Sequence, residues 1–181
     1  TKSASAFEEL CAVLTERDSW HDVVRAGCLT GLASLDDPDR CLDLVLEWSQ
    51  YAKALDCRTA ATKALRRLAD CSVASQSLRA RERLQELVTD PNFRIQLAAI
   101  RELGSLGDRR SMGVLEECES RDVDGRVRRS CREAINSISE DSTLRKRVQT
   151  LEGQLKSQES EGKALKERVV MLEAALKKNS E

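Results

Sequence analysis

A ten-residue pattern that recurs four times constrains this chain more than any other feature of its sequence. The copies begin at Val24, Cys57, Ile95 and Val127, a spacing of about 32 to 38 residues that is typical of stacked helical hairpins. In each copy position one is apolar, positions four and five are small, and position nine is Leu or Ile. Because one helical pair cannot bury its own apolar face, the pattern predicts an all-α solenoid whose neighbouring pairs share one core.

The pattern resembles HEAT repeats of the short, arginine-bearing kind, and the resemblance covers roughly residues 5–138. The arginine stands at position two of the pattern. It is Arg25, Arg58 and Arg128 in three copies, and Gln96 replaces it in the copy that begins at Ile95. The resemblance implies a HEAT-repeat α-solenoid (α-α superhelix) over residues 1–140, followed by a coiled-coil tail over 141–181. We expect about four helical pairs. The helix near residues 6–15 is expected to complete a pair that begins upstream, in a larger protein.

Several short segments predict where helices begin and end. Ser19–Asp22 is a helix start in which the serine hydroxyl can cap the first turn. Asp37-Pro38 and Asp90-Pro91 each join a carboxylate cap to a proline at the first helical position, where the missing N–H is not needed. Gly107 is a left-handed C-terminal cap, and Asp122–Gly125 is a tight turn. Residues 56–69 and 78–89 are expected to form the third pair.

The arginines at position two allow two interpretations. Arg25, Arg58 and Arg128, helped by five further arginines, could contact phosphates; these are Arg66, Arg67, Arg79, Arg81 and Arg83. Acidic residues interleave with them throughout, and few aromatic side chains are available to stack on bases. We therefore expect the arginines at position two to bind carboxylates and carbonyls of the adjoining turns, and we do not expect a nucleic-acid partner.

Composition excludes several classes of protein. A 3% aromatic content and only two prolines argue against a β-sandwich. Residues 1–141 contain 21 basic and 25 acidic residues, and residues 142–181 contain nine and six, so neither part favours a strongly charged partner. No apolar run is long enough for a membrane span, and the first residues lack the apolar core of a signal peptide. We expect a cytoplasmic protein that does not bind membranes.

Seven cysteines form an odd set without a Cys-x-x-Cys pair, and several stand where the repeat core needs a small residue. They are interpreted as reduced core residues, with a disulfide or zinc framework as the alternative. His21 is the single histidine, so a zinc site built on two histidines is not possible in this chain. No phosphate-binding glycine loop or nucleophile elbow occurs. We predict no catalytic, cofactor-binding or metal-binding residue in this chain.

The hydrophobic period changes after Thr143. Apolar residues then alternate steps of four and three, interrupted by Gln158 and Gly162, which is the seam of a coiled coil. With Val148 at position a, three of four flanking g–e pairs are attractive in a parallel coil, as in Arg147 with Glu152. We predict a parallel homodimer through Leu144, Val148, Leu151, Leu155, Leu165, Val169, Leu172 and Leu176. A tail that folds back on the solenoid or stays a single helix is the alternative.

A narrower resemblance rests on Ser19–Gly27 and on Asp122–Arg129 followed by Glu133-Ala134-Ile135. These segments resemble the C-terminal helical region of bacterial gluzincin zinc aminopeptidases of the membrane-alanyl-aminopeptidase type. The resemblance implies an upstream peptidase domain that binds zinc and packs against this scaffold. It transfers no catalytic residue to this chain.

On that hypothesis Cys41, Leu44, Trp48 and Tyr51, which share one stripe of the helix predicted near residues 37–52, are a possible docking face for a protein partner. Burial against the preceding helix is the alternative. The function predicted first is thus a noncatalytic scaffold of an aminopeptidase that dimerises through its tail. A free-standing protein-binding adaptor and a HEAT-scaffold protein that binds nucleic acid or a chromophore remain as alternatives.

Overall fold

The fold was analysed in a computed structural model of the 181-residue chain, which describes residues 2–17, 19–35, 37–70 and 73–178. Within these ranges every regular element is a helix and no strand is present, which confirms the predicted all-α class. The chain divides into two compact units, Thr1–Ser139 and Glu140–Glu181.

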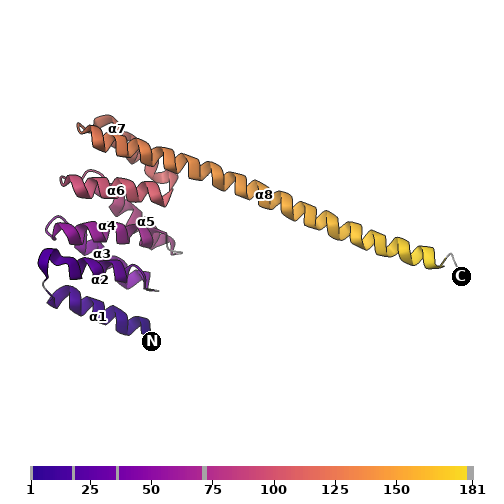
Figure 1. The fold of residues 1–181 in the computed structure, drawn as a ribbon, viewed down its shortest axis with the longest axis horizontal. Coiled ribbons are helices and arrows are strands. Elements are labelled where there is room, and N and C mark those ends of the chain that lie inside the picture. Colours follow the sequence, from indigo (N-terminus) through magenta and orange to yellow (C-terminus); the bar gives the residue numbers. More distant parts are fainter. Residues whose placement is uncertain (1, 18, 36, 71–72, 179–181) are drawn as a thin grey trace. The chain divides into compact units, whose positions relative to one another are not determined.

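The first unit is a stack of helical pairs (Figure 1). Helices α2, α4, α6 and the first part of α8 lie side by side, with α3 between α2 and α4 in sequence and α5 between α4 and α6. Because each pair contacts the next, the core is continuous from pair to pair. The helices are α1 (Lys2–Glu16), α2 (Val23–Leu32), α3 (Pro38–Trp48), α4 (Leu55–Ala69), α5 (Ala74–Leu87), α6 (Phe93–Leu106), α7 (Met112–Arg121) and α8 (Gly125–Lys178), with short 3₁₀ turns at Trp20–Asp22 and Arg109–Ser111.

Helix α1 is the first helix of the described residues. It packs on α2, and its Phe7 ring lies 4.1 Å below the guanidinium of Arg40 on α3. Arg25 of α2 donates to the carbonyl of Leu14 at the end of α1, as Arg58 of α4 donates to the carbonyl of Ser49 at the end of α3. Arg25 therefore contacts the end of α1 as Arg58 contacts the end of α3, and the expectation that α1 completes a pair that begins upstream stays a prediction.

The repeated small and large apolar residues form the core as the pattern predicted. The residues at position five are all buried, and three of the four at position nine are completely buried, while Ile135 is partly exposed. Gly104 marks the closest approach, because a Cβ atom there would lie only 2.9 Å from the Cβ of Ala134 on α8. The backbone of α6 therefore contacts α8 directly. The residues at position five are Cys28, Ala61, Ala99 and Cys131.

Most of the predicted helix boundaries are confirmed. The Ser19 hydroxyl accepts from the backbone N–H of Val24 at 3.1 Å, the Asp37 carboxylate accepts from that of Arg40, and Gly107 has a left-handed φ of 69°. Three boundaries differ. Helix α3 ends at Trp48 and not near residue 52. Helix α5 begins at Ala74, four residues earlier than predicted, and α6 is capped by Asn92 instead of Asp90, because Asp90 is used in another contact described below.

The second unit is helical from Glu140 to Lys178. Residues of the predicted seam from Leu144 to Leu155 have described side chains, whereas the side chains of Leu165, Val169, Leu172 and Leu176 lie outside the described part. For those four positions the structure gives a helical backbone only.

Candidate interaction site

The position-two side chains bind the turns of the stack. Arg25 donates from Nε to the carbonyl of Leu14 at 2.9 Å and from Nη1 to Asp22 at 2.8 Å. Arg58 is almost completely buried and donates from Nε to the carbonyl of Ser49 at 3.2 Å. Both of its terminal nitrogens contact the carboxylate of Asp90, which is the geometry of a two-point guanidinium–carboxylate pair.

One aspartate in each of two turns makes the same pair of contacts. Asp90 accepts the N–H of Asn92 with Oδ1 and the Arg58 guanidinium with both of its oxygens. Asp122 accepts the N–H of Asp124 with one oxygen at 2.8 Å and Nε2 of Gln96 with the other, also at 2.8 Å. Each carboxylate thus holds its own turn in shape and ties that turn to position two of the preceding pair.

The fourth position-two residue is placed differently. Arg128 is exposed, and its guanidinium forms no hydrogen bond or salt bridge among the described residues. The reason is topological, because α8 continues as one helix and supplies no following turn with an aspartate. The predicted column therefore contains Arg25 and Arg58 in contact with turns and Arg128 without such a contact.

Further arginines connect neighbouring pairs. Arg66 lies 3.2 Å from Glu102, Arg79 lies 2.7 Å from Asp43, and Arg83 donates to the hydroxyl of Ser49 at 2.8 Å. These three pairs join residues that are 34 to 36 positions apart, about one repeat. Three of the five further arginines that could have contacted phosphates are thus engaged within the protein.

Asp108, between α6 and α7, makes the same two kinds of contact as Asp90 and Asp122. It accepts the backbone N–H of Arg110 at 3.0 Å and Nη1 of Arg81 at 2.9 Å. Burial raises the pKa of Asp108, but hydrogen bonds from Arg110 and Arg81 outweigh burial, and the pKa lies below its ordinary value. The carboxylate is therefore ionised and paired at neutral pH.

The possible docking face predicted on α3 is only partly accessible. Cys41 is completely buried, and Leu44 is half-buried against the core. Trp48, at the end of α3, is half-buried, with Lys53 Nζ 4.4 Å and the Arg25 guanidinium 5.8 Å from its ring. Tyr51 lies beyond the helix and is 73% exposed.

A more exposed apolar group lies at the turn between α1 and α2. Trp20 is 86% exposed, and Val23 and Val24 next to it are also exposed. The intervening His21 and Asp22 have left-handed φ values of 53° and 52°, which are uncommon outside glycine. This segment was predicted to be a helix start, and its exposure was not predicted.

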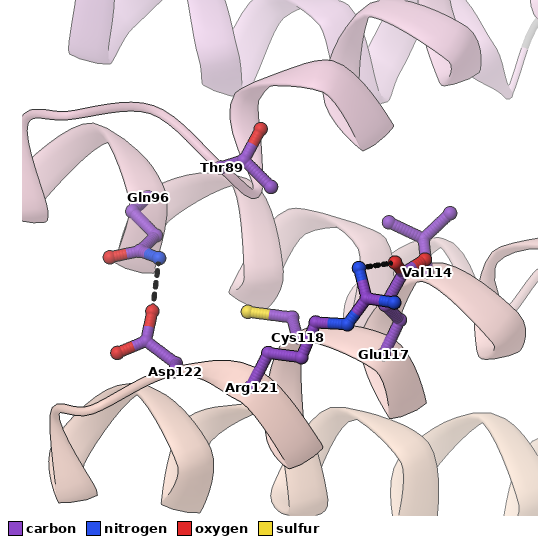
Figure 2. Close-up of a pocket in the computed structure, with 7 residues that line it drawn as sticks. All are labelled: Thr89, Gln96, Val114, Glu117, Cys118, Arg121 and Asp122. Atoms are coloured by element: carbon purple, nitrogen blue, oxygen red, sulfur yellow. Dashed lines mark hydrogen bonds and ion pairs between the residues drawn. The ribbon is translucent and has the colours of Figure 1, made fainter.

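A pocket of about 340 Å³ opens between α6 and α7 (Figure 2). Its polar wall is occupied by internal contacts, the hydrogen bond from Gln96 to Asp122 and the ion pair of Arg121 with Glu117. Cys118 supplies the thiol seen in Figure 2, and burial raises its pKa, so the thiol stays protonated at neutral pH. This pocket offers no activated nucleophile.

The described cysteines are free thiols, and all except Cys11 are buried. They occupy core positions, as the sequence indicated. Among the residues that the structure describes, no three His, Cys, Asp or Glu side chains are grouped to hold a metal ion. The prediction that this chain uses no cofactor stays a prediction.

The tail presents the most regular exposed apolar group. The first four seam residues succeed one another at steps of four, three and four along α8, and each has more than half of its side chain exposed. Their exposed fractions are 61% for Leu144, 52% for Val148, 55% for Leu151 and 57% for Leu155.

Comparison with known proteins identifies the repeat. Residues 68–136 match the family model described as HEAT repeats. No curated protein matches this sequence. In the described ranges no helix is long and apolar enough to cross a membrane.

Two solved structures share the fold. One is a chain in the complex of CpcE and CpcF of phycocyanin lyase from Nostoc sp. PCC7120, with 24% identity and a TM-score of 0.56 over 73% of this chain and 85% of that chain. The other is an engineered protein with 18% identity and a TM-score of 0.51, over 77% of this chain and 64% of that chain. The segment from the end of α4 to the start of α8 is thus a HEAT-repeat region of a helical scaffold.

Proposed function

We propose that this chain is a noncatalytic HEAT-repeat scaffold that binds a protein partner on its solenoid and forms a parallel homodimer through its tail. The observation that carries the proposal is the exposed 4-3-4 stripe from Leu144 to Leu155. A helix with an uncovered leucine stripe gains free energy by pairing with a second helix of the same pattern.

The charges beside the stripe favour a second copy in parallel register. With Val148 at position a, Arg147 stands at g and faces Glu152 at e of the other copy, and the corresponding pairs Glu161–Lys166 and Arg168–Glu173 are also opposite in charge. Gln154–Glu159 is the one pair without attraction. An antiparallel arrangement would not bring these g and e positions together.

The scaffold part of the proposal rests on how the solenoid uses its polar side chains. Its buried arginine and aspartates connect one pair to the next, so they build a rigid surface instead of a reaction centre. Solenoids present such surfaces to partner proteins, because stacked pairs create an extended face.

Light scattering on the complete chain tests the dimer. We expect a mass of about twice the 20.2 kDa of one chain, and a mass of one chain after Leu151→Glu combined with Leu155→Glu. The matched control places the same two negative charges at outward heptad positions c and f, as Thr150→Glu with Gly153→Glu, and should stay dimeric. A wild-type mass of 20.2 kDa at high protein concentration would overturn the proposal.

The finer prediction that this scaffold belongs to a zinc aminopeptidase receives no support from the family match or from the two solved structures. It stays a prediction. The intact mass and zinc content of the protein isolated from its source test it, since a species several times larger that carries zinc is expected from that assignment alone. A free-standing adaptor predicts a metal-free species of one chain's mass.

Chromophore binding is a separate alternative, suggested by the fold shared with the phycocyanin lyase complex. At 24% identity that likeness concerns the fold alone. Incubation with a free bilin, followed by absorbance of the purified chain, tests it. Pigment that remains with the chain would favour this alternative over the protein-binding scaffold.

A further inference from the structure

The outward face formed by α2, α4, α6 and the first part of α8 carries two openings that flank α6. One, of about 180 Å³, is lined by residues of α2, α4 and α6, including Thr30, Lys63, Arg67 and Glu102. The other, of about 320 Å³, lies between α6 and α8 and includes Arg101, Ser105 and Ser137. Because Arg101 and Glu102 are neighbours in α6, the two openings adjoin along that helix.

Positive charge exceeds negative charge on this face. Lys63, Arg67 and Arg101 are exposed, and none of them forms a salt bridge among the described residues. Arg67 donates only to the hydroxyl of Ser34, at 3.2 Å. This distinguishes them from Arg66, whose Nε lies 3.2 Å from the carboxylate of Glu102.

The single carboxylate in the first opening is already enclosed by cations. Burial raises the pKa of Glu102, while Arg66, Lys63 and Arg67 lower it, and the pKa lies above its ordinary value. Glu102 therefore neutralises at most one of the surrounding charges. At least two positive side chains remain without a carboxylate on the surface of α4 alone.

We propose that this face, defined by Lys63, Arg67 and Arg101, binds an acidic segment of a partner protein. The inference rests on the proposed protein-binding function and names its surface and the class of its partner. Carboxylates of the segment would lie opposite the three cations, and the small side chains that line the second opening, such as Ser105 and Ser130, leave room for its backbone.

The same face fits nucleic acid poorly. A nucleic acid places a charged phosphate at every nucleotide, so some phosphates would meet the carboxylates of Glu102 and Glu133 in the two openings. No aromatic side chain lines either opening to stack on a base. An acidic peptide can instead alternate its carboxylates with neutral residues.

Selection from a displayed library of random peptides on the purified full-length chain tests the inference, followed by binding of the selected synthetic peptides. We expect the selected peptides to be acidic. Replacing Lys63, Arg67 and Arg101 together by Gln should weaken their binding roughly 10- to 100-fold, since three exposed ion pairs are lost. The control replaces three exposed cations elsewhere by Gln, Arg17, Arg94 and Lys156, and so removes the same charge.

Each outcome has a distinct meaning. Neutral or basic selected peptides, or equal weakening by both triple variants, would overturn the acidic-segment inference while leaving a protein-binding scaffold. Tighter binding of a mixed-sequence single-stranded oligonucleotide, lost in the Lys63, Arg67 and Arg101 variant alone, would also overturn it and assign the face to nucleic acid. Failure to select any binding peptide would count against the proposed function itself.

Discussion

Helix α8 contains the same apolar spacing twice, with opposite burial. Val127, Cys131, Ala134 and Ile138 follow one another at steps of four, three and four and are buried in the solenoid core. The seam from Leu144 to Leu155 has identical steps and is more than half exposed. The spacing predicts a helix in both segments, but the side chains of the buried segment are smaller than those of the exposed one.

Side-chain volume explains the difference. The buried copy has Cys131 and Ala134 at its centre, which lets α6 approach to the Gly104 contact. The exposed copy has only Val and Leu, the residue types that fill the holes of the facing helix in coiled coils. The step from Ile138 to Leu144 is six residues, so the two stripes do not continue one another. The stripe of small residues thus packs in the solenoid, and the stripe of large residues is the one that we propose to pair with a second copy.

The largest effect is expected where the solenoid buries charge. Arg58→Ala leaves the Asp90 carboxylate buried without its cation, and we expect a loss of roughly 3–5 kcal/mol in the free energy of unfolding. Arg128→Ala, at the same repeat position but exposed, should change it by less than about 0.5 kcal/mol. Urea denaturation measures both. Equal losses would show that position two is not the connection between pairs.

Leucine-to-alanine substitutions in the two regions should affect different properties. Leu103→Ala in the solenoid opens a cavity at a completely buried site and should cost about 2–5 kcal/mol in unfolding free energy. Leu151→Ala should leave the main unfolding transition unchanged and weaken the dimer, as read from the mass at decreasing concentration. If Leu151→Ala lowered the stability of the solenoid as much as Leu103→Ala does, the tail would be packed on the solenoid.

Glycine-to-alanine substitutions should have opposite signs in the two regions. Gly104→Ala forces a Cβ to within 2.9 Å of Ala134 and should destabilise the solenoid by about 1–3 kcal/mol. Gly153→Ala meets no atom within 4 Å and stands at an outward heptad position, so it should stabilise the tail helix by about 0.5–1 kcal/mol. Thermal melts followed at the helical circular dichroism signal report both. A stabilising Gly104→Ala would contradict direct contact between α6 and α8.

The smallest expected effect concerns pH. The folded-state pKa of Asp108 lies below its unfolded value, so its contribution to stability is present above the unfolded pKa and is lost as pH falls through the folded pKa. Asp108→Asn should therefore flatten the decline of unfolding free energy below about pH 4. Denaturation of both proteins across acidic pH measures the difference. Asp43→Asn, which removes an exposed carboxylate paired with Arg79, is the control.

The sequence alone predicted the helices, the buried small residues and the caps at Asp37 and Gly107, because each depends on residues that are near in the chain. It did not predict that Arg58 meets Asp90, since the two are 32 residues apart. A signal was nevertheless present. Asp90 and Asp122 each stand five residues before position one of their copies, which places both at the same point of the repeat.

The site was harder to predict than the fold. Cys41, Leu44, Trp48 and Tyr51 share a helical stripe only if the helix continues to Tyr51, and it ends at Trp48. The exposure of Trp20 depends on the left-handed backbone of His21 and Asp22. The local conformational preferences of these two residues do not predict that backbone. Tertiary contacts decide which cations are paired, as Arg66 is with Glu102. The composition of the chain therefore does not reveal that Lys63, Arg67 and Arg101 have no carboxylate partner among the described residues.

The side chains of Arg58 and Gln96 bond in one direction along the stack, from their own pair to the turn of the next pair. Arg128 is the last residue at position two and is exposed. A helical pair grafted after Ile138 would therefore meet a donor already in place, provided that its turn carried an aspartate five residues before its own position one. Protein engineering could therefore lengthen the solenoid from its α8 side, with the guanidinium of Arg128 binding the aspartate of the added turn.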